Sequence, residues 1–536
     1  MKTILQNLYT RKMCLCSAVL ILLCGACTKN FEELNTNPNE ATNGMLQTDN
    51  LSTGAFLVQM QKNVFPIAQQ PDFGDEVYQT SQNLAGDVYS GYMGATNNWF
   101  SGANNTTYAL IPQWYGQAFT RSFVSIMPAW KRIADIAKIE TPQVYAIATI
   151  IKVEGLHRVA DMYGPLPYTN FGNVSQQSKY DSQRDVYYKF FDELDEAIQI
   201  LTDFNSKFPS ASALANYDFI YGGNIRNWIK FANSLKLRLA LRIAYADPSK
   251  ARTEAESAVN HSIGVMISAS DIAALQHTSS LIYNHPLFII SNNFNDIRMG
   301  ASMESYLKGY NDPRMSKYFT VASDGNYHGI RNGININNKA TYAEGPFSAL
   351  NVAATTPITW QNPAEVYFLR SEGALRGWNM GATAQSLYES GIRTSFELNG
   401  VSGLADGYIA DNTAKPTIYT DSRNGANSSQ ARSAITVKWD ESASFETKLE
   451  RIITQKWLAV YPDGQEAWSE FRRTQYPKIF PVVVNNSQGT INTDVQIRRL
   501  PFPAAQYQNN MHGVTEAISL LGGSDNGGTK LWWDKK

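Results

Sequence analysis

The sequence QKWLAVYPDGQEAWSEFRR, at residues 455–473, carries the most distinctive pattern in this chain of 536 residues. Hydrophobic residues at helical spacing in and around it predict two paired helices, over residues 446–460 and 466–473. Because tryptophan buries a large apolar area, we expect Trp457 and Trp468 to anchor the core on this helix pair. The stretch therefore favours a helical fold whose most conspicuous aromatic residues are structural.

Paired arginines end this helix pair and recur shortly after it. Arg472 and Arg473 close the second helix, and Arg498 and Arg499 open the stretch RRLPFP. A guanidinium group presents several donors in a fixed geometry that suits carboxylates and carbonyl oxygens. We therefore expect these four side chains to fix the C-terminal part of the chain by polar contacts.

The same hydrophobic spacing predicts three more helix pairs. Their ranges are 119–138 with 143–160, 183–203 with 224–245, and 363–378 with 383–398. Pro128 is expected to kink the first of these helices or to mark its true start. Helix pairs that recur along a chain are typical of tetratricopeptide-like superhelices. We predict a mainly α fold, a tetratricopeptide-like helix-pair superhelix with irregular spacing.

Long polar segments separate the helix pairs. Residues 89–108, 282–295 and 322–343 are rich in polar residues and turn formers. Such segments are expected to form surface loops, and structured loops of this length are usually functional. Asn-Gly is a favoured hairpin turn, so a small β-hairpin is predicted over residues 327–336.

The N-terminus has the order of an export signal. A basic start with Lys2, Arg11 and Lys12 precedes an apolar run at residues 13–26. This run is too short for a membrane helix, which needs about 20 residues to cross the bilayer core. All four cysteines lie within the first 27 residues, so disulfides are not expected to hold the folded part together.

Residues 25–27 (GAC) resemble a bacterial lipobox, in which a peptidase cuts before a cysteine that then carries lipid. We predict a lipoprotein signal peptide at residues 1–26 and lipidation of Cys27. Residues 27–42 are polar and interrupted by proline, as expected for a flexible tether, and residues 43–536 are expected to form the folded domain. The alternative is a soluble exported protein in which Cys27 is incidental.

The charge balance argues against a nucleic-acid partner. The chain has 46 basic and 47 acidic residues, a formal net charge of −1, and so it lacks the field that would hold a polyphosphate. A basic stretch lies on one predicted helix and comprises Lys230, Lys236, Arg238 and Arg242. We interpret it as a solvated or salt-bridged face.

Catalytic and metal-binding motifs are absent from the sequence. No two of the six histidines stand three or four residues apart, as metal ligands on a helix would. Glu154, His157 and Asp161 share a helical face, but a di-iron bundle needs a second such motif, so we interpret them as a hydrogen-bonded helix end. We predict no catalytic residue, no metal and no cofactor. A surface hydrolase with two paired carboxylates stays open as an alternative.

Several motifs occur in a characteristic order. DMYGPLPY stands at residues 161–168 and RRLPFP at 498–503, with the tryptophan-rich stretch quoted first between them. NDPR at residues 311–314 and WIKFANSLKLRLALR at 228–242 add to the pattern. Together with the lipobox, these motifs resemble the SusD/RagB family of surface nutrient-binding lipoproteins, over residues 27–534.

The resemblance implies both a fold and a role. Family members pack four tetratricopeptide-like helix pairs against a loop-rich variable region. They bind a nutrient at the cell surface, usually an oligosaccharide or polysaccharide and in some cases a peptide, without enzymatic activity. They form a lid on an outer-membrane transporter of the SusC type, which is powered through TonB. The resemblance thus implies a lipid-anchored outer-membrane protein that faces the cell exterior.

The candidate ligand-binding site comes from loop composition, because the resemblance supplies no binding motif. The candidate residues are Tyr92, Asn97, Asn98, Trp99, Phe100 and Tyr283. A sugar ring has apolar faces and a rim of hydroxyls, so it suits flat aromatic side chains beside amides. The alternative is that Trp99 packs under its own loop. Peptide cargo and a helical-repeat scaffold that binds only proteins are the other functions left open.

Overall fold

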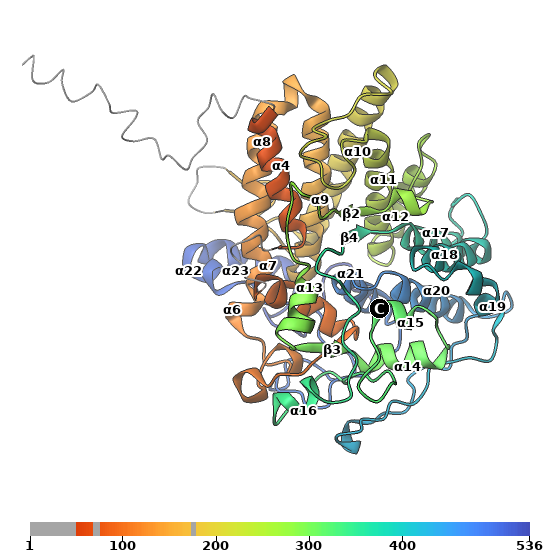
Figure 1. Cartoon of the computed structure of the whole chain (residues 1–536). Coiled ribbons are helices and arrows are strands. Elements are labelled where there is room, and N and C mark those ends of the chain that lie inside the picture. Colours follow the sequence, from red (N-terminus) through yellow and green to blue (C-terminus); the bar gives the residue numbers. More distant parts are fainter. Residues whose placement is uncertain (1–49, 68–75, 173–177) are drawn as a thin grey trace, which may run out of the picture. The chain divides into compact units, whose positions relative to one another are not determined.

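Helices form most of the computed structural model, which describes residues 50–67, 76–172 and 178–536 (Figure 1). The chain divides into two units, residues 1–53 and 54–536, and the fold below is that of the second unit. The predicted signal peptide (1–26) and lipidated tether (27–42) lie outside the described residues.

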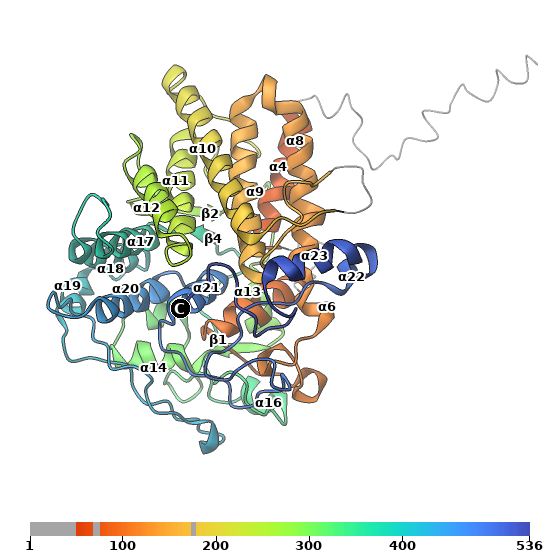
Figure 2. The ribbon, with the colours of Figure 1, turned by 180° about the vertical axis from the view of Figure 1, so that it is seen from behind.

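The helices of all four predicted pairs are present, and the members of the first three pairs pack on each other. They are α8 (Met127–Glu140) with α9 (Pro142–Tyr163), α10 (Gln183–Lys207) with α11 (Ile225–Arg242), α17 (Pro363–Leu375) with α18 (Ala384–Leu398), and α20 (Phe445–Ala459) with α21 (Gly464–Thr474). Helices α8 to α11 stand side by side in both views, followed by α12 (Pro248–Val259), which packs on α11 (Figures 1 and 2). In the last pair, α20 packs on α17 and α18, whereas α21 packs on the π-helical segment η2 (Gln79–Asp87).

Side-chain caps set where these helices begin. An N-terminal cap residue accepts a hydrogen bond from the backbone N–H three residues later, which would otherwise be unpaired. The caps of this kind are Ser182, Asn224, Asn362, Thr383, Ser444 and Asp463. Each stabilises its helix by about 1 kcal/mol, so local sequence fixes the helix starts.

A glycine ends helix α9, and a proline marks the start of helix α8. α9 ends at Gly164, which has a φ of +91° that a side chain would disfavour. The predicted helix at residues 119–138 is interrupted: α7 (Gln117–Arg121) passes into a π-helical turn, η5 (Ser122–Ile126), before α8. Pro128 lies in the first turn of α8, where its missing N–H breaks no hydrogen bond, so it marks the start of that helix.

In the described residues, each of two small sheets joins strands that lie far apart in the sequence. β1 (Met93–Ala95) pairs antiparallel with β3 (Ile297–Met299), and β2 (Ala273–Leu275) pairs antiparallel with β4 (Ile358–Gln361). The hairpin predicted at residues 327–336 is therefore wrong. That segment turns at Gly333 but does not fold back on itself, and Ile330 instead forms an isolated parallel bridge to Gly300.

The loop-rich part carries the remaining short elements, including α14 and α16 in the lower half of Figure 1. The further helical segments are α4 (Leu51–Val64), α5 (Glu76–Tyr78), η3 (Trp99–Gly102), η4 (Asn105–Thr107), α6 (Pro112–Tyr115), η6 (Ala269–Asp271), α13 (Pro286–Phe288), η7 (Ile289–Asn293), α14 (Ala301–Gly309), α15 (Met315–Tyr318), α16 (Lys339–Ala343), η8 (Ser402–Leu404), α19 (Ala405–Ala410), η9 (Gly425–Asn427), α22 (Ala504–Asn509) and α23 (Met511–Leu521).

The two tryptophans of the last helix pair are core residues, as predicted. Trp457 and Trp468 are buried, and their indole N–H groups donate to the carbonyl oxygens of Ser90 (3.0 Å) and Ile497 (3.2 Å). Both tryptophans therefore satisfy their only polar atom inside the fold. They connect the last helix pair to the loops on either side of it.

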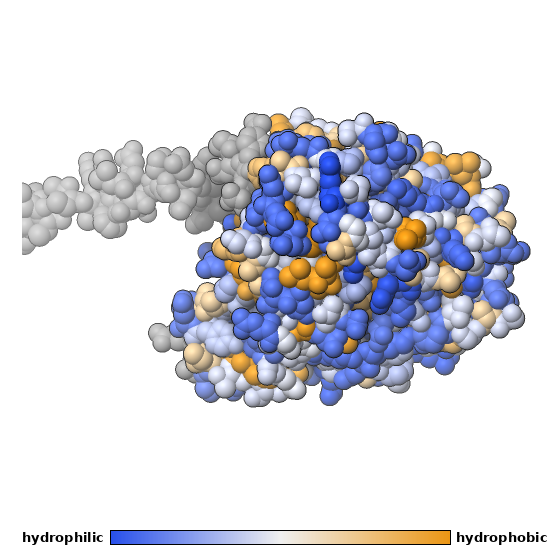
Figure 3. Space-filling model, turned by 90° about the horizontal axis from the view of Figure 1, so that it is seen from below, coloured by the Kyte–Doolittle hydropathy of each residue, from blue (hydrophilic) through white to orange (hydrophobic). Residues whose placement is uncertain are grey.

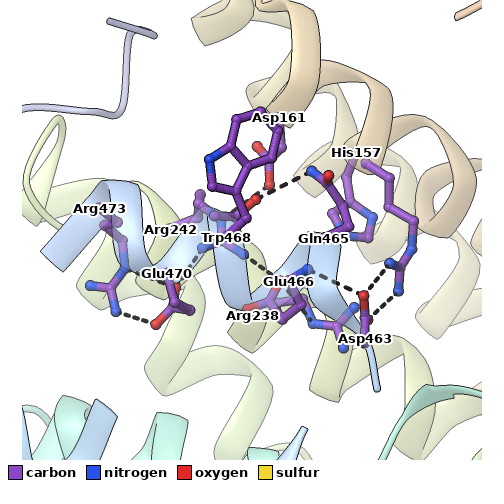
Figure 4. Close-up of polar contacts among 12 residues, drawn as sticks. His157, Asp161, Arg238, Arg242, Asp463, Gln465, Glu466, Trp468, Glu470 and Arg473 are labelled. Atoms are coloured by element: carbon purple, nitrogen blue, oxygen red, sulfur yellow. Dashed lines mark hydrogen bonds and ion pairs between the residues drawn. The ribbon is translucent and has the colours of Figure 1, made fainter. Parts of the chain in front are cut away.

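A buried ionic network joins the helix pairs (Figure 4). Arg242 of α11 contacts Asp161 of α9 (3.1 Å) and also Glu466 and Glu470 of α21. Arg238, one turn earlier, binds both carboxylate oxygens of Glu365 of α17, at 2.8 and 2.7 Å. The sequence predicts a solvated or salt-bridged face for the basic stretch on α11. The structure shows that this face is salt-bridged. Its arginines are buried rather than solvated.

The other predicted arginine contacts are also present. Arg473 binds both carboxylate oxygens of Glu372 (2.7 and 2.6 Å), and Arg472 donates to the carbonyl oxygen of Asp161 (2.5 Å). The second pair behaves alike: Arg498 pairs with Asp534, and Arg499 pairs with Asp525. These contacts fix the C-terminal segment against α9 and α21.

The Glu154, His157 and Asp161 group is structural. The Nδ1 of His157 donates to the carbonyl oxygen of Val153 (3.2 Å), one helical turn back. Burial, together with the nearby arginines, lowers the pKa of His157 well below its usual range, so the ring is neutral. Glu154 binds Arg158 at 2.8 Å. The interpretation as hydrogen-bonded helix groups is confirmed.

The carboxyl of Asp87 is buried where η2 meets α21. The approach is close: a Cβ on Gly464 would lie 2.3 Å from the Cα of Asp87. Asn83 donates to the Asp87 carboxyl (3.0 Å), and no cation of the described residues lies within ion-pair distance of it. Burial therefore raises the pKa of Asp87 from 3.8 to about 8.

Replacing Asp87 with asparagine is expected to stabilise the protein by an amount that grows with pH. In the native state Asp87 stays protonated up to about pH 8, whereas in the unfolded chain it ionises near 3.8. Wild-type stability therefore falls by about 1.4 kcal/mol per pH unit through this window, and asparagine removes that loss. Urea unfolding at about pH 5 and about pH 7 measures the difference. Asp192→Asn, an exposed position, is the control; a gain equal at both pH values would contradict the assignment.

Candidate ligand-binding site

The loop after β1 is held in shape by its own amides. Asn104 accepts a hydrogen bond from the N–H of Thr106 (3.0 Å) and donates to the carbonyl oxygen of Trp99 (2.9 Å). Asn105 accepts from the N–H of Ile111 (2.9 Å). Both asparagines are buried, so they organise the loop and are not available to a ligand.

Three aromatic side chains meet at the surface of this loop, and we call them the aromatic ledge: Trp99, Phe100 and Trp114. The rings of Trp99 and Trp114 are nearly perpendicular, with centroids 5.6 Å apart, and Phe100 lies 5.5 Å from Trp114. Trp99 and Trp114 are half-buried, whereas Phe100 is 60 % exposed. The ledge thus offers one open phenyl ring and two partly exposed indoles, which also pack against the core.

The backbone that presents the ledge is strained. Phe100 and Ser101 both have a φ of +54°, in the left-handed region that non-glycine residues rarely adopt. A residue held in this region costs on the order of 1 kcal/mol or more, and such conformations gather at ligand-binding sites. The fold therefore accepts a cost to keep Phe100 pointing outward.

Polar groups border the ledge. Asn97 is half-buried and donates to Asp296 (3.2 Å), which also binds Lys339 (2.5 Å) and Gln79 (2.8 Å). The side chain of Asn98 makes no hydrogen bond to any residue of the described ranges and is half-buried. The amide of Asn98 is thus free to bind a ligand hydroxyl, while Asn97 belongs to a fixed polar cluster.

An open hollow of about 460 Å³ lies beside α6, and we call it the α6 hollow. Tyr115, next to Trp114 of the ledge, lines it together with Tyr507 and Asn486. Asn486 also donates to Thr107 of the ledge loop (3.2 Å). Burial raises the pKa of Tyr115, so its hydroxyl stays protonated. Ligand pockets typically span about 300–1,000 Å³, so the hollow is large enough for a ligand, although none of the three ledge residues lines it.

For two of the predicted ligand-binding residues, the prediction is wrong. Tyr92 is fully buried: its hydroxyl donates to the carbonyl oxygen of Trp457, and its ring packs on Trp457 and Tyr461. Tyr283 is also buried, and its hydroxyl donates to the carbonyl oxygen of Leu275 (2.9 Å). Neither side chain can reach a ligand, because each fills the core and has its polar atom satisfied there.

The sequence interpretation missed Trp114 and Tyr115. Both lie in the short helix α6, beyond the loop whose composition drew attention. The dipeptide Trp114-Tyr115 stands two residues after Pro112 in a stretch with no long helical pattern, and this signal could have identified them. Trp99, Phe100 and Asn98 do gather at one surface, with Asn97 at its border.

One face of the molecule is seen in the space-filling view of Figure 3. The face in Figure 3 is mostly hydrophilic, with hydrophobic residues in small separate groups. Within residues 50–67, 76–172 and 178–536, none of the helices combines the length and apolar character needed to cross a membrane. The same residues bring no three histidine, cysteine, aspartate or glutamate side chains together as metal ligands.

Similar solved structures have the same fold. A chitin-binding SusD homologue from Flavobacterium johnsoniae is 43% identical, with a TM-score of 0.87 over 90% of this chain and 99% of that chain. A SusD homologue from Bacteroides vulgatus is 35% identical, with a TM-score of 0.85 over 91% and 98% of the two chains. A third, from Bacteroides uniformis, is 38% identical, with a TM-score of 0.84 over 90% and 99%.

The chain matches the model of one protein family. The model described as "SusD-like: Susd and RagB outer membrane lipoprotein" matches residues 33–534. Among curated proteins none matches the chain. The match covers the helix pairs, the aromatic ledge and the C-terminal arginines. The chain therefore belongs to the SusD-like family of SusD and RagB outer membrane lipoproteins.

Proposed function

We propose that this protein captures a saccharide at the cell surface on the aromatic ledge and delivers it intact to an outer-membrane transporter of the SusC type. The observation that carries the proposal is the ledge itself: Trp99, Phe100 and Trp114 meet at the surface on a strained loop. Aromatic side chains of this size are normally buried, and a grouped, partly exposed set indicates a binding surface.

The geometry suits a chain of sugar rings. The apolar C–H face of a ring stacks on an indole or phenyl face, and hydroxyls at the rim bind amides. Trp99 and Trp114 form a corner, so two rings of a bent saccharide can each meet one face. The free amide of Asn98, next to Trp99 in the chain, supplies a hydrogen-bonding group beside the ledge.

The similarity to a chitin-binding homologue supports N-acetylglucosamine oligomers as the first cargo to test. Binding alone accounts for the residues at the ledge, because they provide stacking surface and amides rather than a pair of carboxylates. Delivery without cleavage follows, since a transporter of the SusC type would receive the saccharide as it was captured.

Titration of the purified protein with N-acetylglucosamine oligomers, other soluble oligosaccharides and a peptide mixture tests the proposal. Saturable binding of at least one oligosaccharide, with no shortening of the bound chain, is the expected result. Binding of peptides but of no oligosaccharide would overturn the saccharide assignment. Release of shorter products would overturn delivery without cleavage.

We further propose that Cys27 carries lipid after removal of residues 1–26 and that the domain at 43–536 faces the cell exterior. Replacing Cys27 with alanine is expected to abolish incorporation of labelled palmitate, because the side chain that would carry the lipid is removed. Metabolic labelling measures this, with Cys16→Ala as the matched control that keeps its label. Antibody access on intact cells tests the orientation; undiminished labelling of the Cys27 variant would contradict the anchor.

A further inference from the structure

A second cavity, of about 290 Å³, lies apart from the ledge and shares no lining residue with the α6 hollow. We call it the central cavity. Its walls come from the ends of α15, α18 and α20, from the segment before β4, and from α5 and α13. The lining residues used below are Tyr78, His285, Tyr318, Asn351, Asn399 and Tyr461.

Two buried polar groups line this cavity without a protein partner. Tyr78 and His285 are each 4 % exposed. Within the described part of the chain, neither the hydroxyl of Tyr78 nor the Nε2 of His285 makes a hydrogen bond. Neither atom is cut off from solvent, so both are open to a hydrogen-bonding occupant of the cavity.

The protonation of His285 follows from its contacts. Burial lowers the pKa of His285 to about 4, so the ring is neutral at physiological pH. Its Nδ1 accepts a hydrogen bond from the N–H of Leu287 (3.1 Å) at the start of α13. The ring proton therefore resides on Nε2, which makes Nε2 a donor toward the cavity.

Acceptors and a flat wall complete the lining. Asn351 and Asn399 use their amide nitrogens on the carbonyl oxygens of Ser316 (3.0 Å) and Ser395 (2.7 Å). Each asparagine therefore keeps its side-chain oxygen for another donor. The rings of Tyr318 and Tyr461 lie with centroids 4.5 Å apart and form an aromatic wall.

The cavity holds no unbalanced charge in its depth. Asp463 lines it, but both carboxylate oxygens accept from Arg158, at 2.9 and 2.8 Å. Lys317 also lines the cavity, but it is exposed to solvent. With His285 neutral, a charged ligand would therefore find no buried counter-charge there, and transfer of an unpaired charge from water is costly. Donors, acceptors and an aromatic wall around a small volume match a compact, neutral, hydroxyl-rich ring.

We infer that the central cavity binds one neutral sugar ring, as a second saccharide site separate from the aromatic ledge. This inference rests on the proposed function in one respect, that the cargo is a saccharide. The ring stacks on Tyr461, its hydroxyls accept from Tyr78 and His285, and they donate to the oxygens of Asn351 and Asn399.

Tyr78→Phe tests the inference, because it removes one hydroxyl without changing the shape of the cavity. The hydroxyl has no protein partner, so folding should be unaffected. The background is the Trp99→Ala, Trp114→Ala double variant, which removes both indoles of the ledge. Ligand-observed NMR titration uses glucose, galactose, mannose and N-acetylglucosamine as probes. We expect at least one to bind the double variant, and Tyr78→Phe to weaken that binding about three- to tenfold.

A second variant, which fills the cavity, tests the inference independently of Tyr78→Phe. Val352 is half-buried and lines the cavity. Val352→Trp fills the cavity with a larger side chain, so binding of the same monosaccharide should be lost. Unchanged affinity in both variants, or no monosaccharide bound to the Trp99→Ala, Trp114→Ala double variant, overturns the inference. Oligosaccharide binding to the wild type is measured in parallel, so a failure of the central cavity is distinguished from a failure of the proposed function.

Discussion

Replacing Arg242 with methionine is expected to lower the free energy of unfolding by about 3–5 kcal/mol. Arg242 is fully buried and contacts the carboxylates of Asp161, Glu466 and Glu470 from two other helices. Methionine would leave these carboxylates buried beside fewer cations, and breaking a buried ion pair on one side costs this much. Burial alone would raise the pKa of Glu466, but Arg242, Lys456 and Arg238 outweigh it and hold that pKa low.

Urea unfolding measures the change, and two variants make it interpretable. Arg393, whose ion pairs with Asp406 and Glu389 are exposed, provides the matched control: Arg393→Met should cost less than about 1 kcal/mol. Arg242→Lys keeps the charge but loses the forked geometry, so an intermediate loss is expected. Equal effects of methionine at Arg242 and Arg393 would show that the network does not hold the helix pairs together.

Replacing Trp99 and Trp114 together with alanine is expected to weaken oligosaccharide binding about tenfold to hundredfold, which corresponds to roughly 1.4–2.8 kcal/mol. The two indoles supply most of the flat surface of the ledge, and each single variant should lose part of this effect. Calorimetric titration measures the affinity, and thermal unfolding checks that the fold is intact.

A matched phenylalanine pair controls for the loss of exposed aromatic surface in general. Phe100 on the ledge is 60 % exposed, and Phe208, at the end of α10, is 55 % exposed. Phe100→Ala should weaken binding severalfold, while Phe208→Ala should leave it unchanged. If both variants behave alike, or if the double tryptophan variant binds normally, the ledge is not the binding site.

The helices could be predicted from the sequence because their signals are local. Periodic hydrophobic residues and caps such as Asn224 and Thr383 act within a few residues, so the four pairs were placed with small errors at their ends. The small sheets could not be predicted, because Met93 pairs with Met299 and the contact joins residues far apart in the chain. Asn332-Gly333 does form a turn, but no strands flank it.

In the candidate site too, residues with a local sequence signal could be predicted, and contacts between distant residues could not. Trp99 and Phe100 were identified because glycine and asparagine around them indicate an exposed loop. Tyr92 lies in a similar local sequence, but it is buried against Trp457, a contact that only the folded chain reveals. Trp114 joins the ledge through a ring contact with Trp99 that loop composition does not reveal.

Capture and recovery of a labelled oligosaccharide mixture test the central proposal most directly. The purified protein is incubated with the mixture, washed and eluted, and the bound chains are identified by mass spectrometry. The wild type should retain a defined subset at its original length, and the Trp99→Ala, Trp114→Ala double variant should retain almost none of it. Equal retention by the two proteins, or elution of shortened chains from the wild type, would contradict saccharide capture on the aromatic ledge.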